Sequence, residues 1–141
     1  MEVFFKDPGL DGRAQRIVDS LRTSVSASIE SISIADIYIT NYDGIDNETA
    51  KAIFSDPVAQ NSSFNTPAVE ETNFNWQYIF EISYKTGVTN PTAITARTAI
   101  EAAIGKKLSS ETIVQTAQQL IIRCSPLSDK EMKSLKKHLY N

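Results

Sequence analysis

The chain repeats one order of secondary-structure signals twice, at an offset of about eighty residues. Each copy reads strand, helix, strand, helix. Val3-Phe-Phe-Lys6 followed by Gly9-Leu10 parallels Ile82-Ser-Tyr-Lys85 followed by Gly87-Val88. Several matches in the same order indicate an internal duplication, so the chain is predicted to fold as two related halves.

The correspondence continues into the second strand of each copy. Ile37-Tyr-Ile39 parallels Leu120-Ile-Ile122, and the start of the helix that follows, Ile45-Asp46, parallels Leu127-Ser128. A half of about seventy residues buries only a modest core and leaves a sheet edge or face uncovered. We therefore predict an α+β fold in which the two halves pack on each other as an intramolecular pseudo-dimer.

The first copy contains clear helix signals and one irregular strand. Asp11 can cap a helix whose apolar positions include Ala14, Val18 and Leu21. Residues 31–40 alternate isoleucine with polar residues, but the phase slips at Ala35-Asp36. The slip predicts either a β-bulge or the join of two strands.

The second copy has the clearer boundaries. Residues 76–85 alternate strictly and predict a strand, and residues 112–123 predict the next one. Asn90-Pro91 provides a helix cap followed by proline in the first turn, and Gly105 is suited to end that helix. Ser128-Asp-Lys-Glu131 has the form of a capping box at the start of the last helix.

The segment between the copies shows no periodic pattern. Residues 57–75 are rich in Asn, Ser, Thr and Pro, and we interpret them as a connecting loop. Such a loop is long for a compact domain, which favours a functional segment or a crossover between halves. The predicted organisation is a first repeat at 1–56, the connection at 57–75, and a second repeat at 76–141.

Composition excludes several classes of function. The 141 residues include 41% hydrophobic residues, enough for a core, and carry a net charge of −3, which argues against nucleic-acid binding. No apolar run approaches the ~20 residues of a membrane span, and the first residues lack the pattern of a signal peptide. A single cysteine, Cys124, is typical of a reducing compartment, so the cytoplasm is the expected location.

The sequence offers no convincing catalytic or metal-binding constellation. Cys124 and His138 are the only residues of their types, and no Gly-x-Cys-x-Gly context surrounds the cysteine. One cysteine and one histidine cannot form a zinc site, and the acids around Asp46 lack the spacing of a calcium loop. We predict no catalytic, cofactor-binding or metal-binding residue in this chain.

The best candidates for partner contact are aromatic residues in or beside the connection. Phe64, Phe74 and Trp76 are large aromatic residues in this region, and aromatic residues are enriched at interfaces. They could equally cover the open end of the sheet, and the sequence does not separate these two readings.

The last predicted helix is rich in lysine. Lys133 and Lys137 belong to a group of four lysines between residues 130 and 137. Basic side chains near a helix C-terminus suit the helix dipole, and a solvated face is their simplest explanation. The alternative is a surface on which a neighbouring domain docks.

Several of these segments resemble one known family. Lys85-Thr-Gly-Val-Thr-Asn-Pro91 with Ala96-Arg-Thr-Ala-Ile100, and Val3-Phe-Phe-Lys-Asp-Pro-Gly-Leu10 with Ala35-Asp-Ile-Tyr-Ile39, resemble the PurS-like N-terminal domain of phosphoribosylformylglycinamidine synthase. That enzyme is a glutamine amidotransferase and ligase of purine biosynthesis. The duplication matches its tandem form and covers almost the whole chain, although the first copy carries an extra residue and lacks the Asn-Pro pair.

The resemblance implies an architecture rather than a reaction. It implies two ferredoxin-like repeats that do not process ATP, the ribotide or glutamine, so the chain is not an enzyme on its own. Its implied partners are the glutaminase and synthetase parts, which it holds in register for ammonia transfer. ATP and magnesium belong to the synthetase. The free subunits of the family dimerise, so a homodimer is also implied as an option.

A second family offers an alternative. ACT domains are regulatory modules that bind amino acids between paired ferredoxin-like repeats and show a similar strand-to-helix turn. Lys6-Asp-Pro-Gly-Leu10 fits their pattern well, whereas residues 85–91 fit it less well. An enzyme that uses scattered carboxylates is a third option, and no spacing in the sequence supports it.

Overall fold

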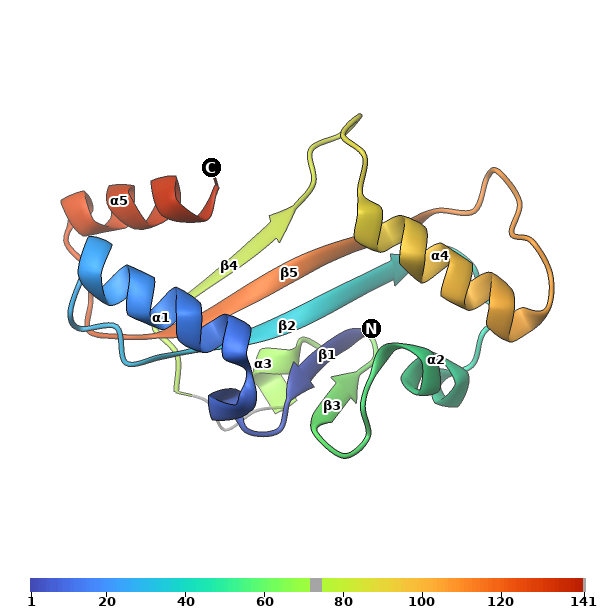
Figure 1. The fold of residues 1–141 in the computed structure, drawn as a ribbon, viewed down its shortest axis with the longest axis horizontal. Coiled ribbons are helices and arrows are strands. Elements are labelled where there is room, and N and C mark those ends of the chain that lie inside the picture. The colour runs from blue at the N-terminus through green and yellow to red at the C-terminus, as the bar shows by residue number, and fades with distance from the viewer. Residues whose placement is uncertain (72–74, 141) are drawn as a thin grey trace.

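The computed structural model describes residues 1–71 and 75–140, which form a mixed α and β structure around one antiparallel sheet (Figure 1). Within these residues the sheet has five strands in the order β3-β1-β2-β5-β4. The strands are β1 (Glu2–Phe5), β2 (Ser31–Thr40), β3 (Gln60–Ser63), β4 (Tyr78–Ser83) and β5 (Val114–Arg123). The predicted α+β class is confirmed.

Helices occupy the connections between these strands, and one more helix follows β5. In chain order they are the 3-10 helix η1 (Pro8–Leu10), α1 (Gly12–Ser24), α2 (Asn47–Phe54), α3 (Ala68–Glu71), α4 (Pro91–Ile104) and α5 (Asp129–Leu139). None of the helices in the described part of the chain combines the length and the apolar character needed to cross a membrane.

The centre of the sheet joins the two halves of the chain. β2 and β5 pair in antiparallel fashion over ten positions, from Ser31 opposite Arg123 to Thr40 opposite Val114. β1 then lies beside β2, and β4 lies beside β5. The longest hydrogen-bonded contact in the sheet is therefore made between strands that are far apart in the sequence.

The expected irregularity at Ala35-Asp36 is absent from β2. The strand runs without a break, and Asp36 lies directly opposite Gln118 in the regular register. The phase slip is not a bulge. The isoleucines before it, Ile32 and Ile34, face the main core, whereas Ile37 and Ile39 lie on the opposite face of the strand. Asp36 faces the helices, where Arg13 donates a hydrogen bond to its carboxylate at 3.0 Å and satisfies its charge.

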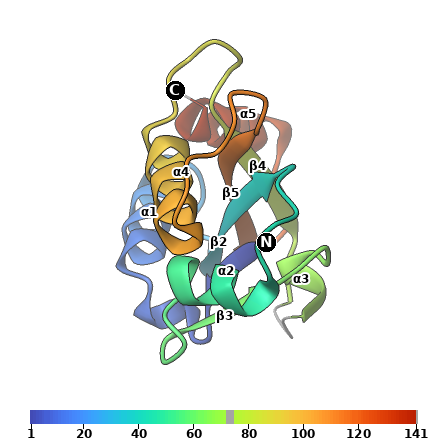
Figure 2. The same ribbon diagram turned by 90° about the vertical axis from the view of Figure 1, so that its right-hand side faces the viewer.

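The two faces of the sheet are covered differently. Figure 2 shows α1 and α4 on one side of the sheet and α3 on the other. The main core lies between the sheet and helices α1 and α5, and it consists of Ala14, Val18, Leu21, Ile29, Ile32, Ile34, Leu120, Ile122, Cys124 and Leu135. On the opposite face, α3 places Ala68 against Phe4 and Ala35 in a smaller cluster.

The sequence predicts a loop over residues 57–75, but part of this connection forms regular secondary structure. Residues 60–63 form β3 beside β1, and residues 68–71 form α3. Since β3 and β4 lie at opposite edges of the sheet, the chain crosses from one edge to the other in this region. The sequence Gln60-Asn-Ser-Ser63 gives no strand signal. An edge strand that buries little apolar surface does not need alternating apolar residues.

The predicted helix termini are confirmed by their hydrogen bonds. The side chains of Asp11, Asp46, Asn90 and Ser128 each accept a hydrogen bond from a backbone N–H in the first turn of the helix that follows. Such caps each stabilise a helix by about 1 kcal/mol. Gly105 ends α4 with a φ of 70°, in the left-handed region where glycine is favoured.

Candidate functional site

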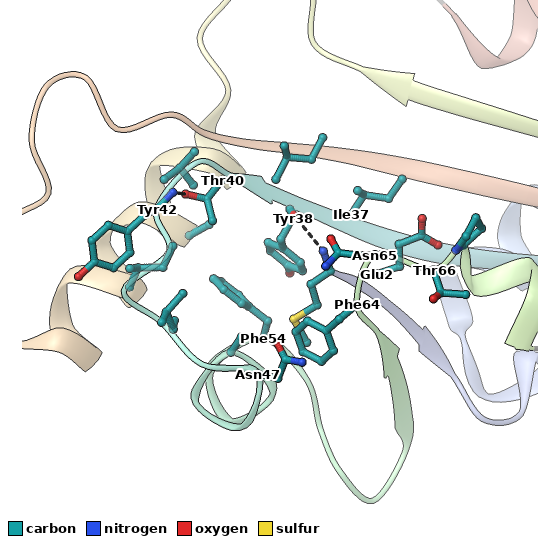
Figure 3. A pocket seen from close by; sticks show the side chains of 18 residues that line it. Glu2, Ile37, Tyr38, Thr40, Tyr42, Asn47, Phe54, Phe64, Asn65 and Thr66 are labelled. Carbon is teal, nitrogen blue, oxygen red and sulfur yellow. Dashed lines mark hydrogen bonds between the residues drawn. The ribbon is translucent and has the colours of Figure 1, made fainter.

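A cavity of about 500 Å³ opens beside the end of β2 (Figure 3). Its walls come from β2, α2, α4 and the turn that follows β3. Representative lining residues are Tyr38, Thr40, Phe54, Phe64 and Ile100. This volume is within the range of small-molecule sites, which are commonly concave and mostly apolar.

The cavity lies beside the part of β2 that extends past its pairing with β1. The last backbone pair between them joins Met1 and Tyr38, whose N–H and carbonyl groups exchange hydrogen bonds of 2.9 and 3.0 Å. β2 continues two residues further, to Thr40, and α2 rather than another strand lies beside this extension (Figure 3). A helix cannot follow a strand edge closely, and room remains between them. Burial lowers the pKa of the Met1 amino group, which lies in this region.

An aromatic stack forms one wall. The rings of Tyr38 and Phe54 lie 4.2 Å apart between centroids and are inclined by 21°. Such pairs contribute about 0.5–1.5 kcal/mol beyond the area they bury. Burial, and secondarily the charge of Asp36, raises the pKa of the Tyr38 hydroxyl, so Tyr38 remains neutral and can donate a hydrogen bond.

Phe64 enters the same cavity from the turn after β3. The next residue, Asn65, has a φ of 57°, a left-handed conformation that asparagine tolerates better than most residues. Lys51 of α2 places its Nζ atom 5.9 Å from the centroid of the Phe64 ring. Among the four described residues predicted as partner contacts, Phe64 is the one that lines the cavity.

The other predicted contact residues lie elsewhere. Trp76 is 47% exposed and precedes β4, while Phe74 lies outside the described residues. Lys133 and Lys137 are exposed on α5, which Figure 1 shows at the opposite end of the molecule from α2. The structure thus separates Phe64 from Lys133 and Lys137.

A second, polar site lies on the sheet between α1 and α4. Asp36 accepts hydrogen bonds from Arg13 at 3.0 Å and from Gln118 at 2.9 Å. Burial opposes the charge of Arg13, but its hydrogen bonds to Asp11 and Asp36 outweigh this effect and raise the pKa of the guanidinium. Asp36 and Gln118 line an adjoining cavity of about 460 Å³. Because Arg13, Asp36 and Gln118 are hydrogen-bonded to one another, their main role is to link α1 to the two central strands.

The cysteine and the histidine are in contrasting environments. Cys124 belongs to the main core, and burial raises the pKa of its thiol. His138 is exposed on α5, with its Nε2 atom 3.3 Å from the hydroxyl of Ser20. A nucleophilic cysteine needs an accessible thiolate, which this environment disfavours. Within residues 1–71 and 75–140, no group of His, Cys, Asp and Glu side chains is arranged to hold a metal ion.

Sequence reasoning missed the Tyr38–Phe54 stack and the cavity. The phase slip in residues 31–40 was one usable signal. If the strand is uninterrupted, Tyr38 faces the helices as Ile32 and Ile34 do, and Ile37 faces away from them. The position of Phe54 beside Tyr38 depends on where α2 packs, and no local pattern encodes that placement.

Comparisons of this chain with protein-family models, with curated proteins and with solved structures find no match.

Proposed function

We propose that this chain is a non-catalytic assembly domain of phosphoribosylformylglycinamidine synthase, in the cytoplasm. It bridges the glutaminase and synthetase parts of that enzyme, so that ammonia passes between them without escaping to water. The observation that carries the proposal is the ten-residue pairing of β2 with β5, one strand from each half of the chain.

The order of elements supports this proposal. The first half runs β1-α1-β2-α2, the second half runs β4-α4-β5-α5, and their central strands meet edge to edge. This order supports two related repeats packed as an intramolecular pseudo-dimer, and we propose that they are ferredoxin-like, PurS-like repeats. Two long paired strands resist sliding, because a shift of one residue would turn every side chain to the wrong face. A rigid body of this kind is suited to holding two other parts in fixed register.

The chain contributes no reacting group in this proposal. Glutamine hydrolysis and the ATP- and magnesium-dependent ligation belong to the partner parts, while this chain contributes surface. Phe64, Trp76, Lys133 and Lys137 remain the proposed contacts, and the structure spreads them between opposite ends of the molecule. Contacts at two ends favour a bridge over a single docking event.

The test compares two ammonia sources. The enzyme is assayed with glutamine and, separately, with ammonium chloride, with this chain present in its natural context or removed. We expect removal to reduce the glutamine-dependent rate at least tenfold while leaving most of the ammonia-dependent rate. Equal glutamine-dependent rates would reject the bridge, as would ammonia release from glutamine by this chain alone.

A second candidate function is favoured by the cavity beside Tyr38. Its volume of about 500 Å³ would accommodate an amino acid or a similar small molecule, as in an ACT-like regulatory domain. However, no residue of Lys6–Leu10, the turn that resembles that family, lines the cavity. Calorimetry with a panel of amino acids and nucleotides separates the two candidates, since tight binding without any effect on the two-source assay would favour the regulatory function.

A further inference from the structure

The two edges of the sheet differ in how open they are to another strand. β3, at one edge, has four residues, all of them polar. β4, at the other edge, has six residues, four of them large and apolar, and no proline or glycine occurs between residues 76 and 86. Natural edge strands are usually short, charged or interrupted, which prevents pairing with another chain. β3 has this protection and β4 has very little.

The register of the sheet shows which backbone groups of β4 face outward. Tyr38 exchanges both hydrogen bonds with Met1 of the β1 side, so even-numbered residues of β2 bond toward β1 and odd-numbered residues bond toward β5. Odd-numbered residues of β5 lie opposite odd-numbered residues of β2, so the even-numbered residues of β5 bond toward β4. These lie opposite Tyr78, Phe80 and Ile82, whose peptide groups therefore point toward β5. Those of Ile79, Glu81 and Ser83 therefore point away from the sheet.

A hydrogen bond just beyond the end of β4 agrees with this assignment. The carbonyl of Thr116, an even-numbered residue of β5, faces the β4 side at a position where β4 has ended. It accepts a hydrogen bond from the Asn90 side chain at 3.3 Å instead of from a strand. The alternation thus holds up to the end of the strand.

Two pairs of residues near the end of β4 lie on either side of Ser83, one charged and one apolar. Glu81, in β4, and Lys85, two residues beyond the end of that strand, are both exposed and make no ion pair within the described residues. Tyr84, the first residue after the strand, is 51% exposed, and it lines the same cavity as the half-buried Ile82. Each pair joins residues that are close to Ser83 and lie on both sides of it.

We propose that two copies of this chain associate through β4, antiparallel, about a two-fold axis that passes through Ser83. The pairing extends each β4 through Lys85, so that Glu81 lies opposite Lys85 of the second copy and Ile82 lies opposite Tyr84 of the second copy. Opposite charges and aromatic–β-branched pairs both stabilise neighbouring antiparallel strands. Because the axis is two-fold, each contact forms twice and the sheets of the two copies become continuous.

The strand that pairs with β4 is proposed to be β4 of a second copy, because one register brings both the charged pair and the apolar pair together. A shift of the axis by one residue, to Ile82, would place Glu81 opposite Ser83 and Lys85 opposite Ile79, so the charges would lose their partners. An interface along one strand is small, so the association is weak and depends on concentration.

The test measures the mass of the full chain by sedimentation velocity from micromolar to millimolar concentration. The wild-type chain is expected to shift from monomer to dimer over this range. Glu81→Pro removes an outward N–H group while leaving the bonds to β5, and proline is tolerated in edge strands in this position. It is expected to abolish the dimer. Ser62→Pro is the matched control, because its N–H faces outward from β3 by the same alternation, and it should leave the dimer unchanged.

Charge reversal tests the register separately. Glu81→Lys alone and Lys85→Glu alone should each weaken the dimer roughly five- to tenfold, since two opposite-charge contacts become like-charge contacts. The double variant Glu81→Lys/Lys85→Glu should restore wild-type association. A wild-type chain that stays monomeric at millimolar concentration would overturn the proposal, and so would a double variant no better than the single ones. Circular dichroism confirms that each variant is folded.

Discussion

Tyr38 and Phe54 stack face to face, with their ring centroids 4.2 Å apart, and this contact joins the end of β2 to the last residue of α2. Beside it the sheet has no further strand. The stack therefore holds α2 in place and shapes the cavity at the same time, and it makes Phe54 the most informative position to change.

Phe54→Ala should lower the free energy of unfolding by about 2 kcal/mol, less than for a fully buried phenylalanine because the Phe54 side chain is half-buried. Phe54→Leu keeps most of the apolar volume but removes the stack, so about half of that loss is expected. Urea denaturation followed by circular dichroism measures both. If the alanine variant were as stable as the wild type, α2 would not depend on this contact.

Glu101 should make the chain sensitive to acid. The pKa of Glu101 is lowered by hydrogen bonds from Lys107 and from the backbone N–H of Leu108, and further by the charges of Lys107 and Arg97. Because the folded-state pKa lies below the ordinary value of 4.5, the stabilisation is present above pH 4.5 and is lost as the pH falls through the folded-state pKa.

The measurement is the melting temperature of wild type and Glu101→Gln between pH 7 and pH 3. We expect the variant to melt lower at pH 7 and the difference between the two proteins to shrink toward pH 3. A difference that stayed constant with pH would show that the carboxylate charge has no part in it.

Cys124 should react slowly with thiol reagents in the folded chain. It is 9% exposed, and burial raises the pKa of its thiol, so both access and the thiolate fraction are reduced. Alkylation by iodoacetamide at pH 8 should be at least tenfold faster in denaturing urea than in buffer. His138→Ala should leave the native rate unchanged, whereas a slower rate in that variant would reveal a thiol–imidazole pair.

Two glycine-to-alanine substitutions should have opposite signs. Gly105 ends α4 at a φ of 70°, where a Cβ atom is strained although no other atom lies within 4 Å of it. Gly105→Ala should therefore cost about 1 kcal/mol. Gly12 begins α1 with an ordinary φ and equally open surroundings, so Gly12→Ala should stabilise the chain by roughly 0.4–1 kcal/mol. Thermal melts of both variants check the pair, and two changes of the same sign would contradict it.

Features that depend on a few neighbouring residues could be predicted from the sequence. The caps at Asp11, Asn90 and Ser128 are made by side chains that bond to backbone groups two or three residues away, so the sequence contains both partners. The same holds for the stop of α4 at Gly105. The apolar spacing of α1 also predicted its buried face.

Features that depend on distant partners could not be predicted. β3 is a strand only because it lies beside β1, about sixty positions earlier in the chain. Asp36 is tolerated on the inner face because Arg13 and Gln118 reach it from two other elements. The cavity depends on where α2 and α4 pack beside β2, which no local pattern specifies.

The pairing of β2 with β5 also determines when the chain can fold. Leu120, which lies opposite Ile34, emerges from the ribosome more than eighty residues later, so β2 is synthesised well before its main neighbour. Closing so long a segment before its contacts form costs entropy and slows the search for the native state. Until then the isoleucines of β2 lack this partner strand, and exposed apolar strand segments of this kind favour association with other unfolded chains.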